Sequence, residues 1–219
     1  MDLLDFARGP ALSWSLMILV LGTVWRLTAI LLTPKPKERS EPRPGTPDDR
    51  TAFIRGVLSR FWPHKHFERQ TLINHLNGYV FHIGLAITVF LYRPHILFIE
   101  DLTGLSWPAL PNTLVYGVGL LTVFSLGLAL QRRLTNPVTK LISTADDYVS
   151  WAVTIVPVLT GLLVVNGIGA RYETLLAIHI LSVCALFVWL PFGKLFHTFV
   201  FVLSRGVTSV RLSRRGATF

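Results

Sequence analysis

The stretch "LAIHILSVCALFVWLPFGKLFHTFV", residues 176–200, places two histidines, His179 and His197, in a segment apolar enough to lie inside a membrane. An ionisable side chain in a bilayer is costly and is by default a candidate functional residue. On one continuous α-helix, eighteen residues at about 100° each return to the same face after ~27 Å of rise. Two rings that far apart cannot bind one metal ion, so each histidine is expected to need a partner from another helix.

The composition around this stretch is that of a membrane protein. Hydrophobic residues make up 51% of the 219-residue chain and charged residues only 15%. Because backbone polar groups find no water in hydrocarbon, we expect an all-α integral membrane bundle of five transmembrane helices, forming one domain over residues 1–219. The last apolar run is longer than a span and should tilt, kink at Pro191 or extend past the bilayer. The five runs, each near or beyond the ~20 residues of a transmembrane helix, cover residues 12–32, 72–92, 114–130, 148–165 and 174–203.

The positive charges predict how the bundle is oriented. Nine of the 21 Lys and Arg residues lie in residues 34–71, and further groups lie in residues 131–148 and after Ser204. Only Arg8, Arg93 and Arg171 fall on the opposite side of the five spans. This bias puts the N-terminus outside and the C-terminus in the cytoplasm, and it explains the net charge of +9 without a nucleic-acid partner. The first run has no basic region before it and no small-residue cleavage site after it, so we expect it to be a retained helix.

Two connecting segments carry further expectations. Residues 34–71 should form a cytoplasmic loop that includes an amphipathic helix around residues 53–61, lying on the membrane surface or against a partner. Residues 93–112 are too hydrophobic for a free loop and should lie along the outer interface, where they can cover a site. The single cysteine, Cys184, excludes an intrachain disulfide and a cysteine-ligated iron–sulfur cluster within this chain, so such a cluster must come from a partner.

Histidines on the second apolar run are candidate partners for His179 and His197. Imidazoles from facing helices supply both axial ligands of a b-type haem, so four paired histidines predict two haems stacked across the membrane. His75 and His82 lie ~10 Å apart on nearly one face of a helix, and His95 follows His82 after a further thirteen residues. Interhelical hydrogen bonding without a cofactor is the alternative explanation of these residues.

Three segments are similar to a known family. "VFHIG" at 80–84, "RRLTNPV" at 132–138 with "TGLL" at 160–163, and "AIHILSVCALFVWLPFGKLFH" at 177–197 resemble the gamma subunit of respiratory nitrate reductase, the dihaem cytochrome b membrane subunit. Related membrane subunits serve heterodisulfide-reductase-like complexes. The resemblance implies a multi-pass protein of the bacterial cytoplasmic membrane that oxidises quinol near an outer haem. Electrons would then pass through an inner haem to a cytoplasmic iron–sulfur subunit, with a molybdenum or disulfide-reductase-like catalytic subunit beyond it.

The resemblance also implies ligands for the two haems. His82 and His197 would bind the inner haem, and His179 would bind the outer one. The family has its fourth histidine ten residues after the one in "FHIG", where this chain has Tyr92. His95 or His75 must then take the fourth position. We favour His95, because its ~20 Å of rise from His82 matches the ~27 Å between the other two ligands better than the ~10 Å of His75.

Other residues are weaker candidates, and the function has one rival. Lys194 and Arg205 are candidate partners of haem propionates, with anchoring at the inner membrane surface as the alternative. Tyr92 and Arg93 are candidates for a quinol pocket. The expected function is therefore an electron-transfer subunit of an oxidoreductase complex rather than its terminal catalytic subunit. The rival is a haem-free membrane anchor or small transporter whose histidines relay protons.

Overall fold

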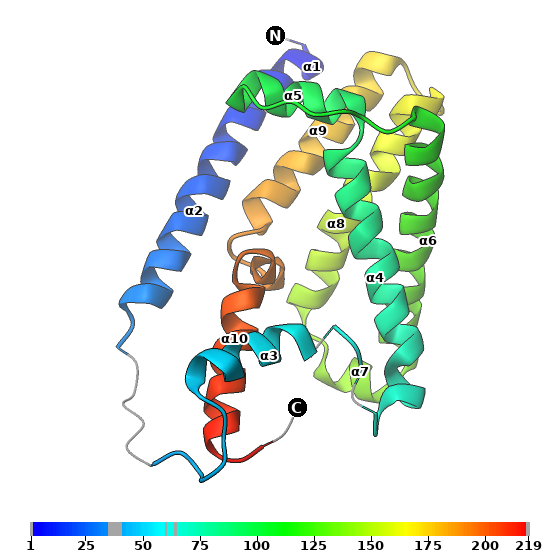
Figure 1. The fold of residues 1–219 in the computed structure, drawn as a ribbon. Coiled ribbons are helices and arrows are strands. Elements are labelled where there is room, and N and C mark those ends of the chain that lie inside the picture. Colours follow the sequence, from blue (N-terminus) through cyan, green and yellow to red (C-terminus); the bar gives the residue numbers. More distant parts are fainter. Residues whose placement is uncertain (1, 35–40, 60, 64, 218–219) are drawn as a thin grey trace.

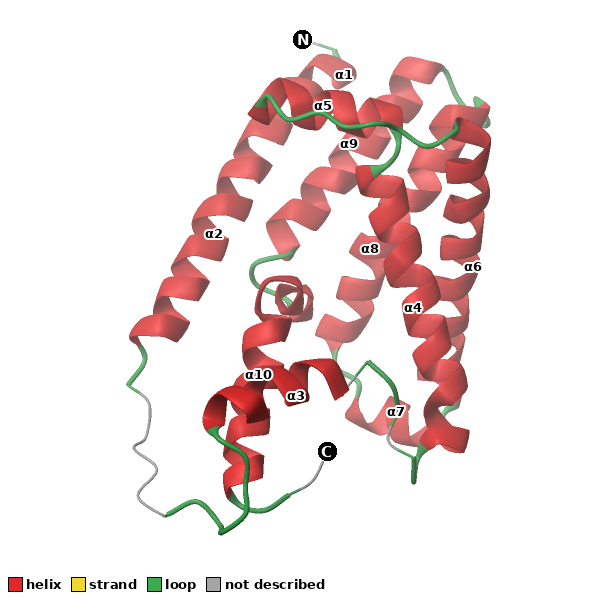
Figure 2. Ribbon diagram, in the orientation of Figure 1, coloured by secondary structure: helices red, strands yellow, loops and turns green. Residues whose placement is uncertain are grey.

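The computed structural model describes residues 2–34, 41–59, 61–63 and 65–217 of the chain. Within these ranges every regular element is a helix (Figure 1 and Figure 2). The prediction of an all-helical chain is therefore confirmed. Five helical stretches in the described part are long and apolar enough to cross a membrane: Leu3–Leu32, Glu68–Phe90, Asn112–Thr135, Ala145–Asn166 and Tyr172–Trp189.

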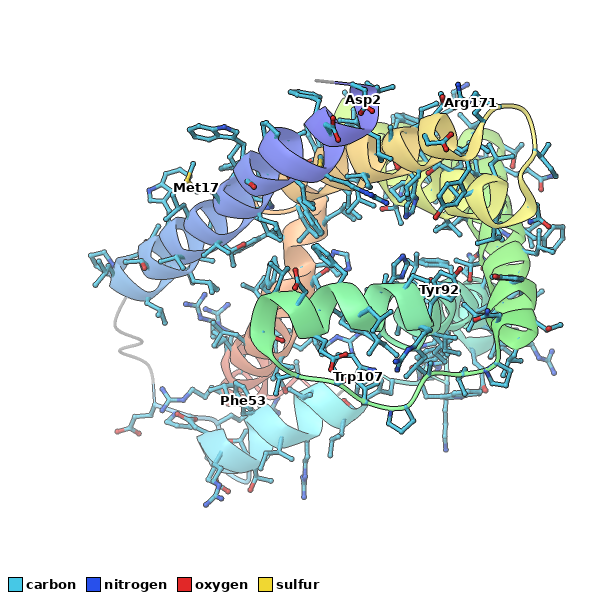
Figure 3. The ribbon with its side chains drawn as sticks, turned by 90° about the horizontal axis from the view of Figure 1, so that it is seen from above. Asp2, Met17, Phe53, Tyr92, Trp107 and Arg171 are labelled. Carbon is cyan, nitrogen blue, oxygen red and sulfur yellow. The ribbon has the colours of Figure 1, made fainter. Side chains whose placement is uncertain are left out.

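The five long stretches pack in a row. The first consists of α1 (Leu3–Phe6), a π-helical turn η1 (Ala7–Ala11) and α2 (Leu12–Leu32), and it is followed by α4 (Glu68–Phe90), α6 (Asn112–Thr135), α8 (Ala145–Asn166) and α9 (Tyr172–Trp189). Helix α4 packs on α6, α6 on α8, α8 on α9, and α9 on α2. Seen from above in Figure 3, the row curves, so that α5 and the end of α4 lie across from α9.

The remaining helices lie at the two ends of the bundle, above and below the row of long helices. Helix α5 lies across one end, near the N-terminus, whereas α3, α7 and α10 lie at the other (Figure 1). We call these the α5 end and the α10 end. The bounds are α3 (Asp49–Ser59), α5 (Arg93–Thr103), α7 (Pro137–Ile142), the 3-10 turn η2 (Lys194–Phe196) and α10 (His197–Arg214).

The last apolar run is broken in two around Pro191, so the expected alternative of a kink there is confirmed and the geometry calculated for one helix through His179 and His197 is wrong. Helix α9 ends at Trp189, and the chain turns through Pro191 and Gly193 before helix resumes. Proline lacks the N–H that a continuous helix needs at this point. A Cβ on Gly193 would collide with the indole of Trp189, so the turn requires glycine there. The ~27 Å rise calculated for one helix therefore does not apply to these two histidines.

A second break separates α4 from α5, so the helix geometry calculated between His82 and His95 is also wrong. Tyr92 has an extended backbone, and α5 begins at Arg93 with proline in its first turn. The segment expected to lie along the outer interface thus contains a helix, which is capped by Gly104 with φ 76°. Ile96, in the first turn of this helix, is fully buried. The turn at Tyr92 directs α5, and His95 with it, across the bundle, so that the chain does not continue along the axis of α4.

The predicted amphipathic helix exists as α3, and its small residues pack against α10. Ala52 and Gly56 are buried against α10, where Ser209 Oγ donates a hydrogen bond of 2.8 Å to the Ala52 carbonyl. Ile54 and Leu58, which the apolar pattern picked out, are exposed. Small residues permit close approach of two helices, so α3 packs against α10 of its own chain.

Candidate functional site

The structure brings His82 and His197 together. His82 lies on α4 and His197 is the first residue of α10, and their ring centroids are 6.2 Å apart with an angle of 79° between the ring planes. The Nδ1 atom of His82 is 2.7 Å from the Gly78 carbonyl oxygen, and that of His197 is 2.8 Å from the Lys194 carbonyl oxygen. Both residues are exposed, and we call them the exposed pair.

A second pair joins His95 on α5 to His179 on α9. Their ring centroids are 6.1 Å apart, and the ring planes are within 15° of parallel. The Nδ1 atom of His95 is 2.8 Å from the Thr88 carbonyl oxygen, and that of His179 is 3.1 Å from the Pro157 carbonyl oxygen. Both residues are partly buried, and we call them the half-buried pair. Burial lowers the pKa of His95, which favours the neutral imidazole.

The four rings share one hydrogen-bonding pattern. Each Nδ1 faces a backbone carbonyl, to which a neutral imidazole donates its proton. The Nε2 atom of each ring has no hydrogen-bond partner among the described residues. Metal-binding histidines typically donate their other N–H to a carbonyl or carboxylate, which fixes the tautomer and the ring orientation. The Nε2 atom of each of the four rings is therefore available to bind a metal ion.

The spacing within each pair matches two imidazoles on opposite sides of one metal ion. With metal–nitrogen bonds of about 2.0 Å, and about 1.1 Å from each nitrogen to its ring centroid, the centroids would be about 6.2 Å apart. The observed values are 6.2 and 6.1 Å. Among the residues that the structure describes there is no cluster of three or more His, Cys, Asp or Glu side chains suited to a metal ion. Two axial ligands are all that haem iron requires of a protein, because the porphyrin supplies the others.

His75 belongs to neither pair. Its Nε2 atom is 3.0 Å from the Phe61 carbonyl oxygen, and its ring contacts Tyr79 edge-on with centroids 5.2 Å apart. The Tyr79 hydroxyl donates to the same carbonyl. His75 thus ties the start of α4 to the segment that leads from α3, and the nitrogen that would bind a metal is engaged.

Tyr92 lies beside the half-buried pair. Its ring contacts His95 edge-on, with centroids 5.2 Å apart, and its hydroxyl lies 3.4 Å from the Tyr116 hydroxyl on α6. Burial, reinforced by the Tyr116 hydroxyl, raises the pKa of Tyr92, so its phenol stays protonated. Arg93 is exposed at the start of α5. Sequence analysis missed Tyr116, and its place in the first turns of the third apolar run was the available signal.

The two candidate partners of propionates have different surroundings. The Lys194 ammonium forms an ion pair with Asp147. The Arg205 guanidinium lies over the Phe61 ring at 5.5 Å, and its buried Nη1 atom has no hydrogen-bond partner among the described residues. A buried cationic donor without a partner is costly, so Arg205 is suited to an anionic group.

Arg26 is a further basic side chain that sequence analysis gave no role. It lies in the first long helix, with its guanidinium 4.6 Å from the centroid of Phe196, the residue before His197. A long hydrogen bond of 3.5 Å joins its Nη1 atom to the Phe192 carbonyl oxygen. Nearby, a Cβ on Gly22 would lie 2.9 Å from Pro191. Helix α2 therefore packs closely against the break between α9 and α10.

Comparison with known proteins gives a relative but no matching family model. A protein of Nitratidesulfovibrio vulgaris strain Hildenborough, described only as "Protein", is 30% identical to the chain over 142 residues. The match covers 64% of this chain and 62% of that protein, so the chain spans less than two thirds of its relative. No family model matches the sequence, and no solved structure matches it.

Proposed function

We propose that this chain is a dihaem b-type cytochrome, the membrane subunit that passes electrons between the quinone pool and a cytoplasmic iron–sulfur partner. The observation that carries the proposal is the presence of two histidine pairs, the exposed pair and the half-buried pair. Each has the spacing of two axial ligands on one iron, and each Nδ1 is hydrogen-bonded to a carbonyl, as expected of haem ligands. When bound, haem supplies reversible one-electron chemistry, and the protein supplies ligands, burial and electrostatic tuning.

In this proposal the α5 end faces outwards and the α10 end faces the cytoplasm of a bacterium. The basic residues gathered in residues 34–71 and after Ser204 support this orientation. The half-buried pair would then hold the outer haem, and the exposed pair would hold the inner one. Arg205 is the better candidate for a propionate, since Lys194 already pairs with Asp147.

The proposal places the quinol site next to the half-buried pair. Tyr92 lies between His95 and Tyr116, and its protonated phenol can donate a hydrogen bond to a quinone oxygen. Arg93 begins α5 and is exposed at the same end of the bundle. An iron–sulfur partner, with a molybdenum or disulfide-reductase-like subunit beyond it, would dock at the α10 end.

The decisive experiment is a count of haem in the purified full-length chain. A pyridine haemochrome assay with a reduced-minus-oxidised spectrum should give two b haems per chain. His95→Ala should lower the count to about one, whereas the matched control His75→Ala should leave it at two. Loss of haem in His75→Ala but not in His95→Ala would reassign the fourth ligand. A folded, haem-supplied parent without haem would refute the cytochrome and leave the anchor or transporter.

A further inference from the structure

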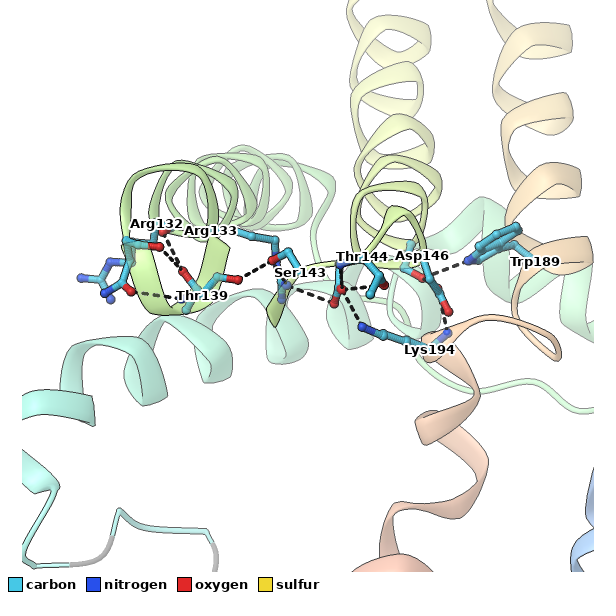
Figure 4. Close-up of polar contacts among 11 residues, drawn as sticks. Arg132, Arg133, Thr139, Ser143, Thr144, Asp146, Trp189 and Lys194 are labelled. Atoms are coloured by element: carbon cyan, nitrogen blue, oxygen red, sulfur yellow. Dashed lines mark hydrogen bonds and ion pairs between the residues drawn. The ribbon is translucent and has the colours of Figure 1, made fainter. Parts of the chain in front are cut away.

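The break between α9 and α10 is held by the first turn of α8. Asp146 Oδ1 accepts hydrogen bonds from the Ser150 hydroxyl at 2.8 Å and from the Lys194 backbone N–H at 3.0 Å. Ser150 Oγ in turn accepts a hydrogen bond of 2.9 Å from Nε1 of Trp189. Trp189 is the last residue of α9 and Lys194 is the first of η2, so the Asp146 carboxylate is connected to both sides of the break (Figure 4).

The neighbouring carboxylate holds the same lysine by its side chain. Asp147 Oδ2 pairs with the Lys194 ammonium, and Asp147 Oδ1 pairs with Arg133 at 3.0 Å. The Asp147 side chain is only 9% exposed, whereas that of Lys194 is 49% exposed. Asp147 also accepts hydrogen bonds from Thr144 in the capping box of α8, so its own position is fixed by the start of that helix.

Lys194 connects these contacts to the exposed pair. Its backbone N–H is bound by Asp146, its ammonium is bound by Asp147, and its carbonyl oxygen lies 2.8 Å from Nδ1 of His197. The hydrogen bond at Nδ1 is the one that sets the orientation of a metal-binding imidazole. In a continuous helix, the backbone would fix the carbonyl. Here the carbonyl belongs to the short 3-10 turn that follows the break and also accepts the backbone N–H of His197. The position of this turn relative to α8 is set by the contacts of Asp146 and Asp147 with Lys194.

We propose that Asp146 and Asp147 are positioning residues that, through Lys194, set the orientation of the His197 ring in the exposed pair. This inference rests on the proposed haem ligation by that pair. It assigns the Lys194 ammonium to the acidic turn of α8 rather than to a haem propionate. The half-buried pair is outside the reach of these contacts, because His179 is bound by Pro157 and Thr160 further along α8.

The test uses the angle between ring planes as its readout. The electron paramagnetic resonance (EPR) spectrum of a ferric haem with two imidazole ligands depends on this angle. The parent, with planes at 79° in one pair and 15° in the other, should give one strongly anisotropic signal and one rhombic signal. His197→Ala identifies which signal belongs to the exposed pair, because that signal disappears.

Asp146→Ala should shift the strongly anisotropic signal and leave the rhombic signal in place, with two haems still bound. Asp146→Asn keeps an oxygen that accepts from the Lys194 N–H, and should restore most of the parent spectrum. Lys194→Met removes the ion pair to Asp147 but keeps the backbone, and should shift the same signal less. Glu173→Ala removes an exposed carboxylate at the opposite end of the bundle and is the matched control, with no change expected in either signal.

The outcomes separate this inference from the function on which it rests. A parent with no haem refutes the proposed function and the inference together. A parent with two haems, and unchanged signals in both Asp146→Ala and Lys194→Met, refutes the positioning role alone. Equal shifts of both signals also refute it, because they indicate a general disturbance of the bundle. If Asp146→Ala does not fold, Lys194→Met decides the question, because an unchanged signal of the exposed pair in that variant refutes the positioning role.

Discussion

The half-buried pair and the exposed pair differ in how the chain holds one ring of each, His179 and His197. In the half-buried pair, His179 lies within the continuous helix α9, and its Nδ1 faces the middle of α8. In the exposed pair, His197 follows a break, and its Nδ1 faces a carbonyl that α8 holds through Lys194. Helix α8 thus supports both pairs, once by direct contact and once through an intermediate residue. The half-buried ring should therefore be the less adjustable of the two.

Removing one ring from each pair is the largest test of this comparison. His179→Ala and His197→Ala should each lower the haem content of the purified chain from about two to about one. Because the pairs share no ring, the remaining haem should keep its parental spectrum in both variants. Haem quantification with EPR checks this. Loss of both haems in either single variant would show that the two sites are not independent.

Crowding the His179 ring should affect only the half-buried pair. A Cβ at Gly161 on α8 would lie 3.3 Å from Cε1 of His179, so a leucine there has to displace the ring. We expect Gly161→Leu to lose most of one haem and retain the other. Gly127→Leu is the matched control, because a Cβ at Gly127 on α6 meets nothing within 4 Å. Haem content close to two in Gly161→Leu would mean that the ring can move without loss of its ligand.

The two pairs also differ in what the sequence could reveal. The apolar runs predict that there are five long helices, although the last run is broken, because length and hydropathy depend only on local composition. The break after Trp189 depends on contacts from Asp146, which is more than forty residues away in the chain. Pro191 signalled a kink, but not its direction. The resemblance grouped His82 with His197, and the structure brings these rings together.

The fourth proposed haem ligand, His95, was harder to predict than the other three, for a physical reason. The position of His95 depends on the turn at Tyr92, which sends α5 across the bundle, and no local pattern specifies that direction. The rise calculated along one straight helix therefore did not apply to His95, and His75 was left as a rival. In the structure His95 lies beside His179, whereas His75 binds the Phe61 carbonyl. The assignment of these histidines as haem ligands stays a prediction.

Loosening α3 should have a smaller effect, and only on the exposed pair. Gly56 packs directly against Ser209 of α10, the helix that begins with His197, so Gly56→Leu has to push the two helices apart. Overpacking of this kind typically costs about 1–3 kcal/mol. We expect a lower thermal midpoint and a shifted EPR signal of the exposed pair, with both haems retained. Ile54→Leu changes an exposed position on the same helix and should alter neither.

The smallest expected effect concerns a single hydroxyl beside the half-buried pair. Thr160 Oγ lies 3.2 Å from Nδ1 of His179 and 3.1 Å from Oγ of Ser182. Thr160→Val removes these contacts and keeps the shape of the side chain, whereas the Pro157 carbonyl still accepts from Nδ1. A hydrogen bond of this kind contributes about 1 kcal/mol.

Redox titration of the Thr160→Val variant should therefore show a small shift in the midpoint potential of one haem, and Thr160→Ser should reverse it. A ring held by the helix alone would show no shift in either variant. The same titration of Asp146→Ala should show a larger shift in the midpoint potential of the other haem. If the shift in Thr160→Val is the larger one, the half-buried ring is not the less adjustable of the two.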